Sequence, residues 1–247
     1  MAVKRLRILA GPNGSGKTSV YTQLKKDKSF NWGVFVNADD IEEKLKNNGY
    51  LDIQTFGVKN FNWEEFRNEY EPFVASKEGK CPVENLRFID EKLFVLKTEL
   101  VDSYLACFVA ESIRQELLTS SGVSVFTTET VMSHPSKLEL MKQAKAHGYR
   151  VYLYYVTTQS PEINIGRVAT RVKQGGHDVK SEKVIARYTR SLGNLLEAIR
   201  LSNRAYLFDN SGTNYVWIAE YDGDTGQLQV RTDMIPKWFK QYVLQRE

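Results

Sequence analysis

The chain has 247 residues, of which 42% are apolar, 26% are charged and 12% are aromatic, and its formal net charge is +4. This length and apolar content are typical of one large domain, or of one domain with a sizeable insertion, and are enough to bury a core. A run of about 18 apolar residues does not occur, which argues against a membrane span, and the mild charge gives no argument for nucleic-acid binding.

Strands and helices are expected to alternate at the start of the chain, and only helices are expected after that, up to about residue 118. Apolar runs predict a buried strand over residues 5–10 and a short strand over 33–40 with a polar tip. Apolar residues at helical spacing predict helices over 17–27, 40–47, 62–76 and 83–118, the last as one long helix or two in series. The aromatic stretch 50–80 is interpreted as the core of a helical subdomain, with a substrate wall or a partner surface as alternatives.

Alternation returns in the second half. Strands are predicted over 122–130, 149–158 and 204–212, followed by a β-hairpin over 215–230. Helices are predicted over 135–147, 161–173, 181–201 and 235–245. This order indicates an α/β fold of three layers, in which helices cover both faces of a mostly parallel sheet. We expect a single domain over 1–247, with a helical insertion at 50–118 and a helical lid region at 161–201.

Polar residues gather where four of the predicted strands end. These ends are residues 11–18, 37–40, 127–130 and 209–211. Because ligands of parallel α/β sheets bind beyond the carboxyl ends of the strands, the sequence predicts a site at this edge.

The first of these ends has the sequence GPNGSGKT, which matches the phosphate-loop pattern G-x-x-x-x-G-K-[ST]. Its residues are Gly11, Pro12, Asn13, Gly14, Ser15, Gly16, Lys17 and Thr18. The glycines allow backbone N–H groups to surround an anion at the positive end of the following helix. Lys17 is predicted to reach the β- and γ-phosphates of ATP or GTP, and the Thr18 hydroxyl to ligate Mg²⁺. A glycine-rich turn with an incidental lysine is the alternative, but the preceding strand and following helix favour a kinase-like P-loop NTPase.

A carboxylate pair follows the second strand, in the sequence NADD at 37–40. Asp39 is predicted to accept the proton of an attacking hydroxyl, or to help hold Mg²⁺. Asp40 is interpreted as the N-cap or a first-turn acid of the next helix. The alternative is that both carboxylates only cap this helix.

The sequence TTET at 127–130 ends the third strand. Glu129 and Thr130 are predicted to project toward the same cleft and to hydrogen-bond an acceptor sugar or nucleotide. A strand-to-loop cap accounts for them equally well.

Arginines are concentrated in a predicted helix–loop–helix at 163–191. Arg167 and Arg171 are four residues apart and share a helix face, while Arg187 and Arg190 lie on the second helix. The flexible Gly175–Gly176 joins the two helices. A lid over a transferring phosphate requires guanidinium groups on mobile elements of this kind. An exposed charged hairpin is the alternative.

Three functions follow from these motifs. The strand-end acid and the arginine-rich lid favour a small-molecule kinase. A P-loop ATPase that acts as a switch or on nucleic acid would require an Asp-Glu strand end and a basic track, and neither is seen. A nucleotide-binding module without turnover would not need Asp39.

Residues 1–20 lack a signal segment, and Cys81 and Cys107 indicate no disulfide framework or metal site, so we expect a cytoplasmic protein without membrane contact.

Together the motifs resemble those of the zeta-toxin family of P-loop kinases. The resemblance rests on GPNGSGKT, NADDI, FTTETVMS, GRVATRVKQGGHDV with IARYTRSL, and AYLFDNSG, in this order, from about residue 5 to residue 212. The insertion at 50–118 and the hairpin at 215–232 depart from the family pattern.

The resemblance implies a kinase that uses ATP or GTP, with a UDP-N-acetyl amino sugar as a possible acceptor and an antitoxin protein as a possible partner. It implies that Lys17 contacts the phosphates, that Asp39 is the base and that Glu129 lies in the acceptor site. It implies that Arg171 is the lid arginine nearest the phosphate. The second lid cation is His177, Arg187 or Arg190, and the match does not decide among them.

Overall fold

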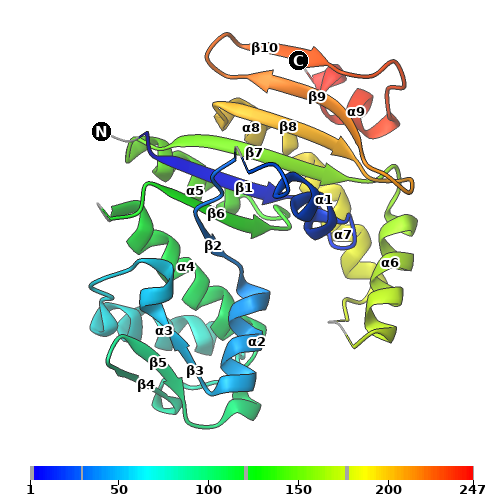
Figure 1. Ribbon diagram of the computed structural model, residues 1–247. Helices are drawn as coiled ribbons and strands as arrows, with labels where there is room; N and C mark the ends of the chain where they lie inside the picture. The colour runs from blue at the N-terminus through cyan, green and yellow to red at the C-terminus, as the bar shows by residue number, and fades with distance from the viewer. Residues whose placement is uncertain (1–2, 29, 120–121, 176–177, 247) are drawn as a thin grey trace. The chain divides into compact units, whose positions relative to one another are not determined.

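A computed structural model describes residues 3–28, 30–119, 122–175 and 178–246 (Figure 1). Its strands are β1 Arg5–Ala10, β2 Val34–Val36, β3 Tyr50–Asp52, β4 Leu86–Ile89, β5 Lys92–Val95, β6 Val125–Thr130, β7 Arg150–Thr157, β8 Arg204–Asp209, β9 Val216–Asp222 and β10 Gln227–Val230. Its α-helices are α1 Lys17–Leu24, α2 Ala38–Asn48, α3 Trp63–Ser76, α4 Ser103–Thr119, α5 Ser136–Ala146, α6 Pro161–Lys173, α7 Ser181–Gly193, α8 Leu195–Leu201 and α9 Lys237–Tyr242. Short 3₁₀ turns are η1 Ile53–Phe56, η2 Val83–Asn85, η3 Thr98–Leu100 and η4 Leu244–Arg246.

Contacts within the chain divide it into two compact units. The first unit consists of Met1–Trp32 and Thr127–Glu247, and the second of Gly33–Phe126. The phosphate-loop motif and the arginine-rich helices belong to the first unit, whereas Asp39 belongs to the second.

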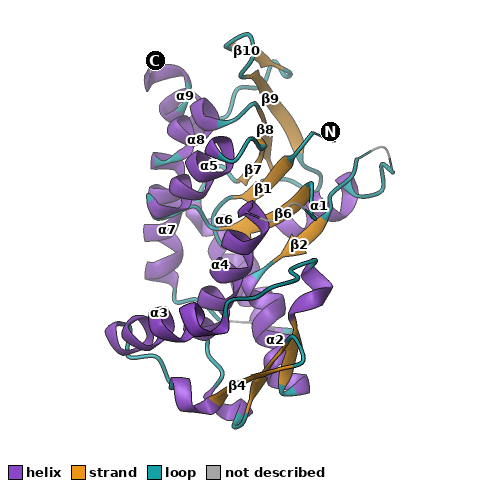
Figure 2. Ribbon diagram, turned by 90° about the vertical axis from the view of Figure 1, so that its left-hand side faces the viewer, coloured by secondary structure: helices purple, strands orange, loops and turns teal. Residues whose placement is uncertain are grey.

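A mostly parallel sheet forms the centre of the fold, in the strand order β10-β9-β8-β7-β1-β6-β2. Strands β1, β7 and β8 pair in parallel, and β9 and β10 are added in antiparallel orientation as a C-terminal hairpin. The first unit carries α1 on one face of its strands and α5, α7, α8 and α9 on the other (Figure 2). The expected α/β fold with its C-terminal hairpin is therefore confirmed.

Burial explains why β1 and β7 lie in the middle of the sheet. Five of the six residues of β1 are buried, as are six of the eight residues of β7, so both strands read as nearly continuous apolar runs. On the α1 side, Leu9 and Val156 pack with Val20, Trp32 and Phe208. This packing fixes the end of β1, where the phosphate-loop motif begins.

The second unit combines helices α2, α3 and α4 with a small antiparallel sheet of order β3-β5-β4 (Figure 1). The helix predicted over 83–118 is wrong in its first part, since residues 86–95 form the β4–β5 hairpin and the α-helix of this range, α4, begins at Ser103. The hairpin turns at Asp90 and Glu91, which both have positive φ, 49° and 58°. Such two-residue turns usually contain asparagine and glycine, so Asp90 and Glu91 are not recognisable as turn residues from the sequence.

Aromatic rings make up much of the core of the second unit. Phe66 lies 5.4 Å from Trp63, 5.5 Å from Tyr70 and 5.2 Å from Phe108, between ring centroids. The interpretation of the aromatic stretch as core agrees with this packing.

The Tyr70 hydroxyl provides a test of that core. It is fully buried and donates a 2.7 Å hydrogen bond to the backbone carbonyl of Cys81. We expect Tyr70→Phe to lower the free energy of unfolding by about 1–3 kcal/mol, because the buried carbonyl loses its partner. Urea unfolding measures this, with Tyr104→Phe at an exposed site of α4 as the control. Equal stabilities of the two variants would contradict the assignment.

The arginine-rich region 161–201 contains α6, α7 and α8, with the last two helices meeting at Asn194. Its Nδ2 donates a 3.0 Å hydrogen bond to the carbonyl of Met132. Gly176 and His177, the centre of the predicted lid loop, lie outside the described residues.

Among the described residues, no helix has both the length and the apolar content that crossing a membrane requires.

Candidate phosphate-binding site

The phosphate-loop motif joins the buried end of β1 to the first turn of α1. Gly11 has φ 142°, and a side chain there would collide with the backbone carbonyl of Val156 on β7. Gly16 has φ 85° in the left-handed region, and a side chain there would collide with the Asn210 amide. Both positions therefore require glycine, as the motif predicts.

Lys17 is drawn into this loop rather than exposed to solvent. Lys17 is 7% exposed, and its Nζ lies 3.0 Å from the Gly11 carbonyl oxygen and 3.3 Å from the Pro12 carbonyl oxygen. The Glu129 carboxylate at the end of β6 lies 3.4 Å from the same Nζ. The Glu129 carboxylate and the two carbonyls compensate the buried ammonium, and the positive end of α1 beside it favours a ligand with negative charges.

Two asparagines hold the loop from neighbouring elements. Asn164 on α6 donates a 2.7 Å hydrogen bond to the Asn13 carbonyl, and Asn210 after β8 donates a 2.9 Å hydrogen bond to the Ser15 carbonyl. The Thr158 hydroxyl in turn donates to Asn164 Oδ1 at 2.5 Å. Asn210 lies in the polar strand end at 209–211, where the sequence predicts the site, whereas the sequence predicts no role for Asn164. Asn164 stands out in the structure because it is a polar residue of α6 that is fully buried. The sequence alone does not reveal this burial.

Removing the Asn210 amide tests this support. We expect Asn210→Ala to weaken the binding of a nucleoside triphosphate by about tenfold, because the Ser15 carbonyl loses its partner and the loop loosens. Calorimetric titration measures the change. Asn214→Ala alters an exposed asparagine in the following loop and is expected to bind as the unaltered protein does. The same affinity in both variants would show that Asn210 does not support the loop.

Two arginines contact the loop or its surroundings. Arg187 on α7 donates from Nη1 to Asn13 Oδ1 at 3.1 Å. Arg167 on α6 donates from Nη2 to the Gly212 carbonyl at 3.3 Å, while its Nη1 is buried close to Gly16 and has no hydrogen-bond partner among the described residues. Arg171 and Arg190 are exposed on the same two helices. The structure thus brings Arg167, which carried no specific role in the sequence prediction, to the loop.

The predicted acceptor residues Glu129 and Thr130 lie at the end of β6. The Thr130 carbonyl accepts a hydrogen bond from the Gly11 N–H at 3.2 Å, and its hydroxyl accepts one from the Met132 N–H at 3.0 Å. Thr130 therefore stabilises the turn after β6, as the cap alternative states, and an acceptor role for it stays a prediction.

Asp39 and Asp40 occupy the first turn of α2 in the second unit. The N-cap is Asn37, whose side chain accepts a 3.0 Å hydrogen bond from the Asp39 N–H. Neither aspartate is the N-cap, which corrects that alternative, and both are exposed. Negative charge is favoured at a helix N-terminus, so the exposed Asp39 carboxylate is well placed in the first turn of α2. Its catalytic role stays a prediction.

The residues of the loop fit Mg²⁺ and a nucleoside triphosphate. Thr18 is exposed in the first turn of α1, so its hydroxyl can ligate a metal ion. Mg²⁺ characteristically takes its other ligands from phosphate oxygens and water. In the described part of the chain, no group of three or more His, Cys, Asp and Glu side chains could hold a metal ion.

Comparison with known proteins gives the family. Residues 6–195 match the AAA_33 family, described as an AAA domain. The chain therefore belongs to this family, and it has the fold of P-loop NTPases. An uncharacterized protein of Haemophilus influenzae is 40% identical over 63 residues, which are 26% of this chain and 45% of that protein.

Solved structures show the same fold at low identity. The chain resembles the complex of AvrRxo1-ORF1 with AvrRxo1-ORF2 and sulphate, with a TM-score of 0.57 at 17% identity over 97% of this chain and 63% of that one. The ATP complex of the same pair gives 0.55 at 18% identity over 92% and 60%. The PezAT toxin-antitoxin system of Streptococcus pneumoniae gives 0.51 at 14% identity over 98% and 80%. The chain spans less than two thirds of the AvrRxo1 chains.

Proposed function

We propose that the protein is a phosphotransferase that moves the γ-phosphoryl group of Mg·ATP, or of Mg·GTP, to a hydroxyl group of a small molecule. The observation that carries this proposal is the buried Lys17 ammonium, which lies among the carbonyls of the phosphate loop and beside Glu129. Arg187 contacts the same loop through Asn13. This concentration of positive charge beside backbone N–H groups is what a triphosphate and its transferring phosphoryl group need.

Each residue of the site has a role in this reaction. The backbone amides of residues 11–18 and Lys17 bind the phosphates, and the Thr18 hydroxyl ligates Mg²⁺. Arg171 and Arg187 neutralise the charge that develops on the transferring group. Asp39 takes the proton of the acceptor hydroxyl as the new O–P bond forms and the bond to the leaving nucleoside diphosphate breaks. When bound, ATP would supply the phosphoryl group, and Mg²⁺ held by the Thr18 hydroxyl would partly neutralise the charge of its phosphates.

A UDP-N-acetyl amino sugar is the acceptor that we propose, with Glu129, Thr130 and His177 as its contacts. The resemblance of the motifs to the zeta-toxin family supports this acceptor, and so does the position of Glu129 beside Lys17. His177 lies outside the described residues. An antitoxin protein as partner is supported by the same resemblance and by the fold shared with the PezAT toxin-antitoxin system. We propose that the protein acts in the cytoplasm.

The reaction is tested by incubating the protein with Mg·ATP and a panel of UDP-sugars and nucleosides. Mass spectrometry is expected to find one product that is heavier by a phosphoryl group. Lys17→Ala and Asp39→Asn serve as inactive controls. ADP formed without a phosphorylated acceptor would instead favour a P-loop ATPase that acts as a switch.

The second lid cation is tested by two arginines of α7. We expect Arg187→Ala to lower kcat by about a hundredfold, because a preorganised donor near the transferring group is lost. Arg190→Ala, three residues further along the same helix and exposed, is expected to retain most of the turnover. Steady-state kinetics of the two variants distinguish them, and the reverse order of effects would assign the role to Arg190.

A further inference from the structure

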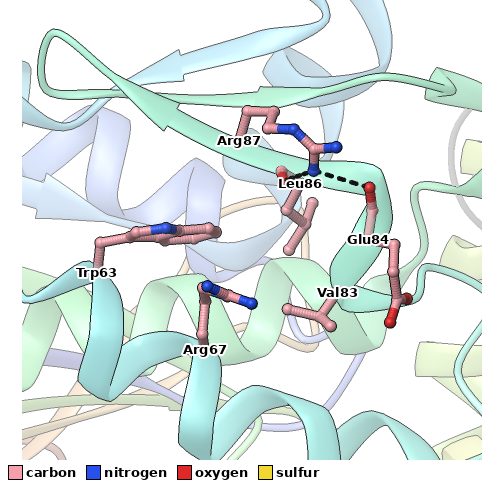
Figure 3. A pocket seen from close by; sticks show the side chains of 6 residues that line it. All are labelled: Trp63, Arg67, Val83, Glu84, Leu86 and Arg87. Atoms are coloured by element: carbon pink, nitrogen blue, oxygen red, sulfur yellow. Dashed lines mark hydrogen bonds between the residues drawn. The ribbon is translucent and has the colours of Figure 1, made fainter.

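A second candidate site lies wholly within the second unit, between α3 and the start of the β4–β5 hairpin. It is a pocket of about 390 Å³. The lining residues are Trp63, Arg67, Val83, Glu84, Leu86 and Arg87 (Figure 3). This volume falls in the range of small-molecule sites, which are about 300–1,000 Å³.

The pocket has an apolar base and a flat wall. Val83 and Leu86 are buried and form its aliphatic part. The Trp63 indole is held by near-parallel stacking on Phe66 and Phe88, with interplanar angles of 18° and 17°. Because the ring is fixed by its neighbours, it offers a preorganised surface for another flat ring.

Two guanidinium groups border this apolar surface. Arg87 donates from Nη1 to the carbonyls of Glu84 at 2.9 Å and Leu86 at 2.7 Å, which fixes its position above Leu86 (Figure 3). Arg67 extends from α3 below the Trp63 ring, and its ion pair with Glu64 is 3.9 Å long. Both guanidinium groups retain N–H donors for a ligand anion.

Glu84 is the acidic side chain among the lining residues. Its carboxylate points away from the Trp63 ring, on the far side of Val83 (Figure 3). The indole wall and the two arginines therefore set the chemistry of the pocket, while Glu84 reduces its positive charge.

We propose that this pocket binds a small organic anion that carries a flat apolar ring. The ring stacks on Trp63 and covers Val83 and Leu86, and the carboxylate or phosphate group accepts hydrogen bonds from Arg67 and Arg87. This site is separate in residues from the phosphate loop and does not rest on the proposed kinase activity.

Four probes separate the contributions of ring and charge. They are 2-naphthoate and phenyl phosphate, which have both, inorganic phosphate, which has charge alone, and 2-naphthylmethanol, which has the ring alone. Each is titrated into ¹⁵N-labelled full-length protein while the indole N–H signal of Trp63 is followed by NMR. The signal is assigned by its loss in Trp63→Phe. We expect saturable shifts with the first two probes and at least about tenfold weaker binding of the other two.

Variants locate the binding. Arg67→Gln is expected to weaken 2-naphthoate binding about tenfold, and Glu84→Gln to strengthen it, because a repelling carboxylate is removed. Arg200→Gln, at an exposed site of the first unit, and Lys17→Ala are expected to leave it unchanged. Circular dichroism confirms that each variant is folded.

Several results would overturn the proposal. They are equal binding of 2-naphthylmethanol, an unchanged affinity in folded Arg67→Gln, or loss of binding in Lys17→Ala, which would place the anion at the phosphate loop. A shift of the Trp63 signal by an acetylated Asp-Phe-Asp peptide but not by 2-naphthoate would also overturn it and indicate a protein-docking surface.

Discussion

Replacing Lys17 with alanine is expected to lower kcat/KM for phosphoryl transfer by about a thousandfold or more, because the variant loses the cation that we propose as the contact of the transferring phosphates. The ammonium is buried against two loop carbonyls and Glu129, so solvent cannot replace it. Steady-state kinetics with the acceptor found in the mass-spectrometric panel measures the loss.

The matched control is Lys26→Ala, which removes an exposed lysine just after α1 and is expected to keep normal turnover. Thermal unfolding of both variants separates catalysis from folding, since removing Lys17 also leaves Glu129 without its ion-pair partner. A folded Lys17→Ala variant with turnover near that of the unaltered protein would contradict the role of this residue.

Asp39→Asn is expected to reduce kcat by about a thousandfold while leaving nucleotide affinity nearly unchanged. The amide keeps the size of the side chain but cannot accept the proton of the acceptor hydroxyl. Kinetics gives kcat, and calorimetric titration gives the affinity for the nucleotide.

Asp40→Asn is the control for this substitution, because Asp40 is also exposed in the first turn of α2. It is expected to retain turnover. Equal losses of turnover and nucleotide affinity in Asp39→Asn would mean that Asp39 holds the metal or the structure rather than a proton. A large loss in Asp40→Asn alone would assign the base to the neighbouring carboxylate.

Local patterns predicted those parts of the fold in which one physical requirement dominates. The apolar run of β1, the helix Pro161–Lys173 and the C-terminal hairpin follow from periodicity and turn residues, and the structure has them where the sequence predicted them. The glycine positions of the phosphate loop follow from the need for positive φ and for close approach of the backbone.

The β4–β5 hairpin could not be recognised in the same way. Leu93, Leu96 and Leu100 recur at helical spacing. Leu93, however, is a buried residue of strand β5, where it pairs with Phe88 of β4. Its turn residues, Asp90 and Glu91, adopt positive φ without glycine. Tertiary packing thus overrides the local pattern, and periodicity alone cannot distinguish the two outcomes.

Contacts across the chain were the part of the site that sequence could not supply. Asn164 and Asn210 reach the loop from residues that are far away in sequence, and Arg187 reaches Asn13 from α7. The spacing of arginines indicated a cationic region but could not rank its members. Arg167 contacts Gly212 and lies close to Gly16, which the spacing of arginines does not indicate, and the position of Arg171 nearest the phosphate stays a prediction.

The most direct test of the account is a calorimetric titration of Mg·ATP and Mg·GTP into the unaltered protein and into Lys17→Ala. The account predicts saturable binding of at least one nucleotide with one site per chain, and a loss of most of that affinity in the folded variant. If neither nucleotide binds, or if both proteins bind equally well, the phosphate loop is not a nucleotide site and the proposed phosphoryl transfer is wrong.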